Sequence, residues 1–363
     1  MDQAWRRWLE DAGAALEDGR VVHYGNPDLE RRVALTGAVL ADLGHWGVLR
    51  ARGADAASFL QGQLTADLRE VEAGRSRLAA HCTPQGRVRA LYRVLAREDE
   101  GACGELLLFL PEDLLEQALA ALRRYVLMAR VELEPAGEAW VRLGYADPQG
   151  EARLARALEA EPEALPREAD GVARVPGPEG QGVTVVRLHG PRPRFLLLGE
   201  RPAMERLWER LDVHAAPVGA PAWELLEVLA GEPQVYPQTT ELFLPQMLNL
   251  DLLGGVSFSK GCYTGQEVVA RTRHLGRLKR RMRRLRCPGR DEPPPPGAAL
   301  HSPAWRADEA AGTVVRAASD PDGGCELLAV IPHELAGAPL HLEGPQGPAC
   351  ELLPLPYPLP EGP

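Results

Sequence analysis

The segment KGCYTGQE at residues 260–267 contains the residues whose types and spacing are best suited to chemistry. Cys262 stands just before a predicted helix, QEVVARTRHL, and Lys260 lies two residues upstream. A helix N-terminus and a nearby ammonium group both favour the thiolate form of a cysteine. Gly261 and Gly265 would let the backbone approach a ligand closely or adopt a positive φ. The pattern predicts a reactive or ligand-contacting thiol, with a small buried residue in a tight turn as the alternative.

Lysine and asparagine are rare in this chain, which makes the positions that keep them informative. Of 41 basic residues only Lys260 and Lys279 are lysine, and asparagine occurs only at Asn26 and Asn249. An ammonium group is a compact charge that can lose its proton when buried, whereas a guanidinium keeps its charge. We therefore expect Lys260 to have a role that arginine would not fill at that position.

A basic run, RTRHLGRLKRRMRRLR, follows the motif at residues 271–286. Residues 260–290 contain 11 lysines and arginines but only one acid, although the whole chain has a formal net charge of -10. Such a band attracts an anionic partner. It is either an RNA or DNA surface, or a helix end and a strand whose charges face water. No aromatic side chains interleave the run as stacking platforms, so we favour the second interpretation and do not expect direct nucleic-acid binding.

Composition and cysteine spacing indicate the class of protein and its compartment. Hydrophobic residues make up 45% and charged residues 25% of the 363 residues, as in ordinary globular proteins. No apolar run approaches the roughly 20 residues that span a bilayer, and the N-terminus lacks the apolar block of a secretion signal. The cysteines form no CxxC pair and no zinc pattern, which predicts no metal site and fits a reducing cytosol. We therefore expect a cytoplasmic protein without a membrane partner. The cysteines are Cys82, Cys103, Cys262, Cys287, Cys325 and Cys350.

The hydrophobic pattern divides the chain into two α+β lobes and a β-rich C-terminal part. From Trp46 to Pro135 the order is strand, helix, hairpin, strand, helix, strand, with a turn at residues 83–86 inside the hairpin. This order is typical of a ferredoxin-like, split βαβ layer. A similar order recurs in residues 136–221, and DEPPPPG at 291–297 indicates a linker before short strands typical of a β-barrel. We predict a first domain of residues 1–135 plus about 222–285, a second domain of residues 136–221 and a barrel of residues 291–363.

The segment ELFLPQMLNLDLLGGVSFSKGCYTGQEVVAR, together with LGRLKRR after it, resembles the signature of the YgfZ family of folate-binding proteins. These proteins are related to the glycine-cleavage T-protein, an aminomethyltransferase. The resemblance extends over nearly the whole chain through RGADAASFLQGQLTADL, AAHCTPQGRV and the C-terminal LPLPYPLPEG. It implies a ring of three domains around a central pocket for tetrahydrofolate or a one-carbon derivative. It also implies a cytoplasmic protein that supports iron–sulfur enzymes as clients, including those that thiolate tRNA.

The resemblance also implies which residues form the site. Two tryptophans that bracket folate in a bacterial relative match Trp46 and Trp223 by local context, and stacked indole faces suit the pterin and benzoyl rings. The family's cysteine is Cys262, and its acidic lead-in to the motif is present as Asp251. We expect Cys262 and Lys260 to face the cavity that holds the folate. The remaining predicted ligand contacts are Tyr263, Gly261, Gln266 and Glu267.

One departure from the T-protein pattern bears on activity. The T-protein has an acidic pair on the hairpin strand after the turn glycine, and a carboxylate there serves aminomethyl transfer. Here the strand after Gly86 reads RVRALYRVLAR, without an acid, so the acid–base group for that chemistry is absent. We predict a folate-binding accessory protein without aminomethyltransferase activity. Two alternatives stay open: a one-carbon transferase that uses Asp67 or Glu267, and an RNA-binding factor that acts through residues 271–286.

Overall fold

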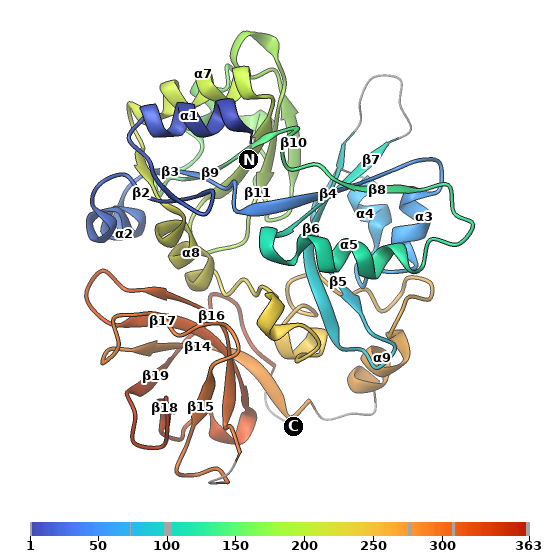
Figure 1. Cartoon of the computed structure of the whole chain (residues 1–363), viewed down its shortest axis with the longest axis vertical. Coiled ribbons are helices and arrows are strands. Elements are labelled where there is room, and N and C mark those ends of the chain that lie inside the picture. The colour runs from blue at the N-terminus through green and yellow to red at the C-terminus, as the bar shows by residue number, and fades with distance from the viewer. Residues whose placement is uncertain (1, 73, 98–103, 275–277, 307–308, 361–363) are drawn as a thin grey trace.

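Three bodies make up the computed structural model: two α+β lobes and a β-barrel that meet around a common junction (Figure 1). The structure describes residues 2–72, 74–97, 104–274, 278–306 and 309–360. The predicted α+β fold with a C-terminal barrel is confirmed, although the domain boundaries differ from the predicted ones.

The first lobe is built on a five-stranded antiparallel sheet. Its elements are β4 (Trp46–Arg52), α3 (Ala56–Gln61), α4 (Leu68–Glu72), β5 (Arg77–Cys82), β6 (Val88–Arg97), β7 (Glu105–Pro111), α5 (Leu115–Arg123) and β8 (Glu132–Pro135). The strand order is β5-β6-β7-β4-β8, and the apolar run ELLLFLP of β7 is buried at every position between β6 and β4. The β5–β6 turn lies where the sequence predicts it, and Gly86 there adopts φ +73°, a conformation that favours glycine.

The second lobe is built on a six-stranded sheet. Its elements are α1 (Gln3–Asp11), α2 (Pro27–Thr36), β3 (Val39–Asp42), β9 (Val141–Ala146), α6 (Ala152–Ala157), β10 (Val172–Val175), β11 (Val183–Arg187), β12 (Arg194–Gly199), α7 (Arg201–Asp212) and β13 (Ala216–Val218). The strand order is β10-β11-β12-β9-β3-β13, with β13 parallel to β3. Residues 1–42 therefore do not belong to the first domain, where the sequence analysis places them, because β3 pairs with β9 and β13 of the second sheet. Trp5 of α1 also packs edge-on against Trp208 of α7, with ring centroids 6.2 Å apart.

The C-terminal barrel is closed by six strands. They are β14 (Arg280–Cys287), β15 (Ala299–His301), β16 (Gly312–Ser319), β17 (Cys325–Pro332), β18 (Leu340–Leu342) and β19 (Ala349–Leu353), in the order β14-β17-β16-β15-β18-β19. The predicted barrel start at residue 291 is too late, because β14 pairs with β17 along its whole length. The DEPPPPG segment therefore connects two strands of the barrel instead of two domains.

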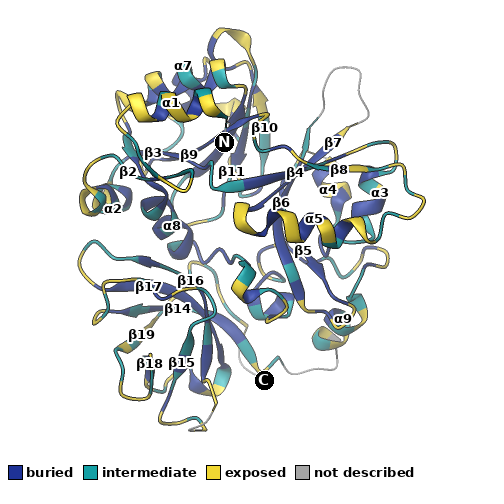
Figure 2. Cartoon of the chain, in the orientation of Figure 1, coloured by how far each residue is buried: buried dark blue, intermediate teal, exposed yellow. Residues whose placement is uncertain are grey.

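Helix α8 (Ala220–Leu229) lies at the junction of the three bodies. It contacts α2, the hairpin strand β2 (Arg20–His23) and the barrel strands β16 and β17, and Figure 2 shows it largely buried. The partner of β2 is β1 (Ala15–Glu17). A further helix, α9 (Gln266–His274), begins at the last two residues of the KGCYTGQE motif.

A buried ion network joins the lobes to the segment after α8. Arg93 of β6 donates hydrogen bonds to Asp170 at 2.7 Å and to Glu232 at 2.8 Å. Arg194 of β12 donates to the second oxygen of Glu232 at 3.0 Å. All four side chains are buried, so separating the lobes would leave uncompensated charges. The network therefore holds the two lobes in a fixed relation.

Candidate functional site

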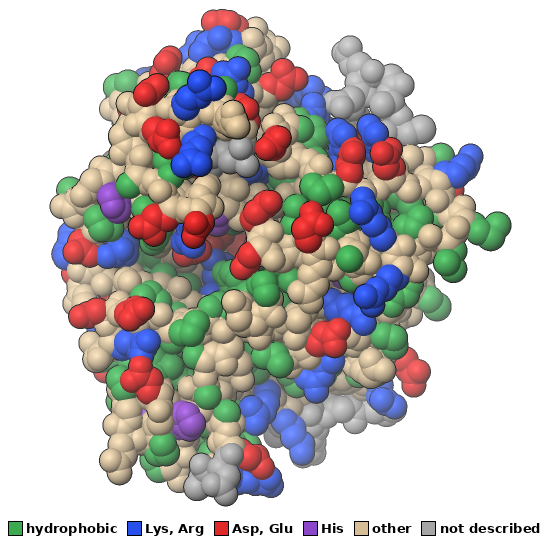
Figure 3. Space-filling view, viewed as in Figure 1, with side chains coloured by type: hydrophobic (Ala, Val, Ile, Leu, Met, Phe, Trp, Pro, Cys, Tyr) green, Lys and Arg blue, Asp and Glu red, His purple; other side chains and the backbone are tan. Residues whose placement is uncertain are grey.

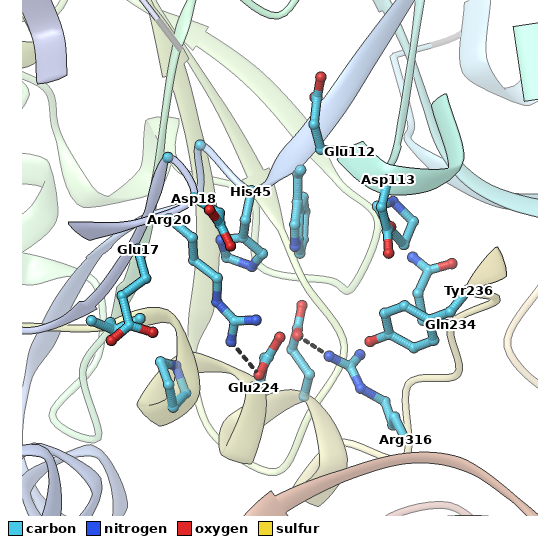
Figure 4. A pocket seen from close by; sticks show the side chains of 17 residues that line it. Glu17, Asp18, Arg20, His45, Glu112, Asp113, Glu224, Gln234, Tyr236 and Arg316 are labelled. Atoms are coloured by element: carbon cyan, nitrogen blue, oxygen red, sulfur yellow. Dashed lines mark hydrogen bonds and ion pairs between the residues drawn. The ribbon is translucent and has the colours of Figure 1, made fainter. Parts of the chain in front are cut away.

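A cavity of about 630 Å³ lies where the two lobes and the barrel meet. Figure 3 shows acidic side chains around the hollow at this junction, and Figure 4 shows the lining from close by. A cavity of this size can hold a cofactor-sized ligand. Its lining residues are Glu17, Asp18, Gly19, Arg20, Val22, Gly44, His45, Trp46, Pro111, Glu112, Asp113, Pro221, Glu224, Glu227, Gln234, Tyr236 and Arg316.

Aromatic side chains stand on two sides of this central cavity. Trp46, the first residue of β4, is half-buried, and its ring meets that of His45 edge-on at a centroid distance of 6.4 Å. Tyr236 lies across the cavity from His45, beside Gln234 and Asp113 (Figure 4). The structure therefore brings the predicted ligand contact Trp46 to the cavity. It adds Tyr236, which the sequence does not single out.

Trp223 does not line the central cavity, contrary to the prediction. Its side chain is fully buried, and its indole carbons lie 2.8 Å from where a Cβ on Gly144 would be. Helix α8 instead turns Pro221, Glu224 and Glu227 toward the cavity, as residues spaced three apart share one helix face. Helix α8 therefore contributes to the cavity lining through another face, and the side chain of Trp223 belongs to the core between α8 and the second sheet.

The charge of the central cavity is predominantly negative. Arg20 pairs with Glu224 at 2.7 Å, and Arg316 pairs with Glu227. Figure 4 shows Asp113 directed into the cavity and Glu112 directed away from it. An anionic group would be repelled here, whereas N–H donors would find acceptors. The lining carboxylates without an ion-pair partner among the described residues are Glu17, Asp18, Glu112 and Asp113.

His45 is the titratable group beside Trp46. Burial, together with Arg20, Arg316 and Arg142, lowers the pKa of His45 well below its ordinary value, so the imidazole is neutral at pH 7. Its Nε2 has no hydrogen-bond partner among the described residues. A neutral imidazole with an unused nitrogen can exchange one hydrogen bond with a ligand.

Lys260 does not face the central cavity, because its charge is held inside the first lobe. Its Nζ donates hydrogen bonds to the carbonyl oxygens of Gln61 at 2.6 Å, Leu64 at 2.7 Å and Ala66 at 2.8 Å, at the end of α3 and just after it. Burial lowers the pKa of Lys260 to about 8, while three carbonyl acceptors favour the ammonium form. A tetrahedral ammonium reaches three acceptors around one point, which a planar guanidinium does not. This arrangement explains why lysine is retained here.

Gly265 is required by chain packing. It adopts φ +85°, and a Cβ there would lie 2.5 Å from the carbonyl oxygen of Thr83 and 3.1 Å from the Cα of Gly86. A Cβ on Gly86 would in turn lie 3.1 Å from the Cβ of Val268. The two glycines let the start of α9 pack directly on the β5–β6 turn.

The other predicted ligand contacts of the motif also lie away from the central cavity. Tyr263 is buried, with the Lys260 ammonium 5.2 Å from its ring centroid. Gly261 is exposed, and a Cβ on it would meet no atom within 4 Å. Gln266 is half-buried. The Glu267 side chain is 88% exposed. Within the described residues, therefore, no part of KGCYTGQE lines the cavity that holds Trp46.

Cys262 of this motif is an exposed free cysteine. It is preceded by the buried Lys260 and followed by the buried Tyr263, so the backbone around the thiol is well anchored. The Lys260 ammonium is directed at carbonyl oxygens of residues 61–66 and not at the thiol. The thiol is accordingly placed to meet a partner or reactant from solvent, and not a ligand in the central cavity.

Comparison with known proteins identifies the relatives of this chain. No protein-family model matches it. The tRNA-modifying protein YgfZ of Sodalis glossinidius (strain morsitans) is 31% identical over 331 residues, which are 88% of this chain and 92% of that protein. The protein of the same name from Yersinia pestis (strain Pestoides F) is 32% identical over 327 residues, 89% of this chain and 93% of that protein. The chain belongs to the YgfZ family.

The fold of this YgfZ-family chain is also found in a solved structure. The glycine cleavage system aminomethyltransferase T from Bartonella henselae superposes with a TM-score of 0.73, covering 97% of this chain and 96% of that chain at 19% identity. At this identity the likeness establishes the three-domain fold alone. Within the described ranges of the YgfZ-family chain, no helix is long and apolar enough to cross a membrane.

The basic run of the YgfZ-family chain is largely engaged in the barrel. Arg281 pairs with Asp251 at 2.7 Å, and Arg284 and Arg286 pair with barrel acids, each at or below 2.9 Å. Residues 275–277 of the run lie outside the described part of the chain. No described residue of 271–286 lines the central cavity. Residues 280–286 of the run therefore lie in the barrel strand β14, where three arginines are paired with acids and Asp251 holds Arg281.

The two acids considered for one-carbon transfer lie elsewhere as well. Asp67 accepts hydrogen bonds from Arg69 and Gln61, and the Arg69 contact holds the pKa of Asp67 well below its usual range. Glu267 faces solvent at the start of α9. Neither carboxylate lines the central cavity, so neither is placed to exchange a proton with a ligand bound there. Among the described residues, no group of three or more His, Cys, Asp or Glu side chains is arranged for a metal ion.

Proposed function

We propose that this chain is a tRNA-modification protein of the YgfZ type that binds tetrahydrofolate, or a one-carbon derivative, in the central cavity. Its relatives at 31% and 32% identity bear the name tRNA-modifying protein YgfZ. The observation that carries the folate proposal is the cavity of about 630 Å³, which is lined by Trp46 next to His45 and, across from His45, by Tyr236, Gln234 and Asp113. We further propose that the protein supports iron–sulfur enzymes that thiolate tRNA.

The polar groups of the central cavity fit the pterin end of folate better than its glutamate tail. The pterin ring presents a ring N–H and an amino group side by side, and the Asp113 carboxylate can accept from both. Gln234 can donate or accept beside it, while the flat ring lies against Trp46. The unpaired carboxylates disfavour the anionic tail, so the proposed orientation places the pterin inside and the tail toward solvent.

The hairpin-strand position that carries the T-protein's carboxylate gives no support to aminomethyl transfer, although other carboxylates line the cavity. Strand β6, VRALYRVLAR, carries no acid, and Asp67 and Glu267 lie away from the cavity. A carboxylate that manages the proton of the folate amine is needed for that chemistry. We therefore propose binding and client support without turnover of an aminomethyl-lipoyl donor, and robust turnover of that donor would contradict this part.

The experiment that tests the proposal is an anaerobic titration of the purified protein with tetrahydrofolate, followed by tryptophan fluorescence. Saturable quenching is expected in the wild type. Trp46→Phe should lose most of the quenching, and isothermal calorimetry should show weaker binding by roughly two- to tenfold, as expected for one aromatic stacking contact.

The matched control is Trp305→Phe, because Trp305 is also half-buried but lies in the barrel away from the cavity. Its calorimetric Kd should equal that of the wild type. A flat calorimetric response to millimolar tetrahydrofolate, or equal loss of affinity in both variants, would overturn the folate proposal.

A further inference from the structure

Three cysteines that are far apart in the sequence form a row across three adjacent strands of the barrel. Cys287 on β14 lies directly opposite Cys325 on β17. On the other edge of β14, Arg286 lies opposite Glu351 of β19. The next step in that antiparallel register places Cys350 opposite Cys287. The central cysteine therefore has one cysteine on each side.

The spacing in this row suits a covalent bond between neighbours. Opposed residues in antiparallel strands have Cα atoms about 4.5 or 5.5 Å apart, depending on the pair type. Disulfides bridge Cα separations of about 4.4–6.8 Å, so either neighbour of Cys287 is in range. All three side chains pack in the same barrel core.

Exposure distinguishes the two neighbours of Cys287. Cys287 and Cys325 are fully buried, whereas Cys350 is half-buried. A reactant from solvent therefore reaches Cys350 first, and the thiol nearest to it across β14 and β19 is Cys287.

We propose that Cys350 and Cys287 form a peroxide-sensitive thiol pair that oxidation converts into a disulfide between β19 and β14. The Cys350 sulfur attacks one oxygen of hydrogen peroxide, which breaks the O–O bond, gives a sulfenic acid and releases water. The Cys287 sulfur then attacks the sulfenic sulfur and forms the S–S bond, and the departing hydroxyl leaves with the Cys287 proton as a second water. Two thiols are oxidised and one peroxide is reduced to two waters.

The pair reacts more slowly than an open thiol. Burial and the neighbouring Cys287 raise the pKa of Cys350, and burial raises the pKa of Cys325 to about 12. Since the thiolate is the reacting form, the barrel thiols stay reduced under mild conditions. Among the described cysteines, the exposed Cys262 is the competing site and has to be removed to isolate the barrel reaction.

The disulfide would fasten a strand whose continuation supports the central cavity. After β19 the chain runs to Tyr357, whose hydroxyl donates to the carbonyl of Gly231 at 2.8 Å, just beyond α8. Asn249 donates to the same hydroxyl at 3.3 Å. Oxidation would thus tie the C-terminal tail, and through it the end of α8, to the first strand of the barrel.

The test uses the full-length Cys262→Ser protein, treated with hydrogen peroxide, then alkylated with N-ethylmaleimide, digested and analysed by mass spectrometry. Two thiols per chain should be lost, and a peptide pair linked through Cys287 and Cys350 should appear and vanish on reduction. Adding Cys350→Ser should abolish the linked pair, and adding Cys325→Ser should leave it.

The circular dichroism spectrum and thermal melt of each variant verify that it is folded before oxidation. The linked peptide is sought first in the Cys262→Ser protein, which keeps all three barrel cysteines. The proposal can therefore be tested even if a variant with a further barrel substitution folds poorly. A sulfinic acid at Cys350 with Cys287 still alkylated would overturn the proposal. A link between Cys287 and Cys325 in its place would do the same.

Discussion

The central cavity and the KGCYTGQE motif differ in what their polar groups contact. In the motif, Lys260 directs its ammonium to three backbone carbonyls and Gly265 packs on the β5–β6 turn. In the cavity, Asp113 has no ion-pair partner and His45 has an unused ring nitrogen among the described residues. Buried polar groups normally find partners, so the unused buried nitrogen of His45 is available for a ligand. The Asp113 carboxylate beside the same ligand-sized space is exposed and open to a ligand as well. The KGCYTGQE motif, which stands out in the sequence, thus forms a packed structural segment with one exposed thiol. The residues that form the cavity do not stand out in the sequence.

The largest expected effect on stability comes from removing the three hydrogen bonds of the Lys260 ammonium group. Lys260→Met leaves three carbonyl oxygens without their donor, and each buried orphan costs about 1–3 kcal/mol. We expect the free energy of unfolding in urea to fall by about 3 kcal/mol or more. The matched control is Lys279→Met, since the only other lysine is exposed and its loss should change stability by less than about 0.5 kcal/mol. Equal stability of the two variants would show that these hydrogen bonds contribute nothing.

The next effect concerns the ion network beside the cavity and depends on pH. Burial alone would raise the pKa of Glu232, but Arg93 and Arg194 lower it to about 2, against about 4.3 in an unfolded chain. Between these values the unfolded chain binds more protons, so stability is present above about pH 4.3 and decreases as the pH falls toward 2. The loss is roughly 3 kcal/mol from this carboxylate.

Urea unfolding at several pH values between 7 and 2.5 measures this dependence. Glu232→Gln should unfold more easily at pH 7 and should show a smaller decrease in stability toward acid than the wild type. Glu116→Gln on the exposed side of α5 is the control and should keep the wild-type pH slope. If the Glu232 variant also keeps that slope, the network does not set the acid sensitivity of the fold.

A smaller effect tests the cavity as a folate site. Asp113→Asn removes a charged acceptor while keeping the shape of the side chain, and hydrogen bonds to charged groups contribute about 1.5–3 kcal/mol. We expect the Kd for tetrahydrofolate, measured by calorimetry, to rise by roughly ten- to a hundredfold. Glu112→Gln is the neighbouring control, because Glu112 is directed away from the cavity. An equal effect of the two substitutions would mean that the charge of the cavity matters but the position of Asp113 does not.

The fold could be predicted well from the sequence because its elements have strong local patterns. The strand at Trp46–Arg52 and the turn at residues 83–86 lie where the pattern places them. The domain boundaries could not be predicted, since the pairing of β3 with β9 and of β14 with β17 joins segments that are far apart in the sequence. Periodicity reports which face of an element is buried, but it does not report which sheet buries it.

The site was less predictable for a related reason. Trp46 is brought to the cavity, but Tyr236, Asp113 and His45 come from separate segments and have no local pattern that marks them. Trp223 shows the limit of local context, because a helix turns about 100° per residue and its neighbour Glu224 lines the cavity while its own ring is buried. The sequence pattern predicts the helix α8, but tertiary packing decides which of its faces lines the cavity.

The smallest expected effect on the molecule itself separates the two regions most clearly. Cys262 is exposed and does not line the central cavity, so Cys262→Ser should change the free energy of unfolding by less than about 0.5 kcal/mol and leave the Kd for tetrahydrofolate unchanged. If the thiol meets a client from solvent, the same variant should nevertheless fail to restore thiolated tRNA in cells that lack the native protein, as measured by mass spectrometry of tRNA nucleosides. Cys350→Ser, which removes a half-buried thiol in the barrel, is the matched control and should restore it. Full restoration by Cys262→Ser would make the whole motif structural and would leave the central cavity as the one functional region of the described chain, whereas selective failure would mean that the protein works with two separate sites, one for a ligand and one for a partner.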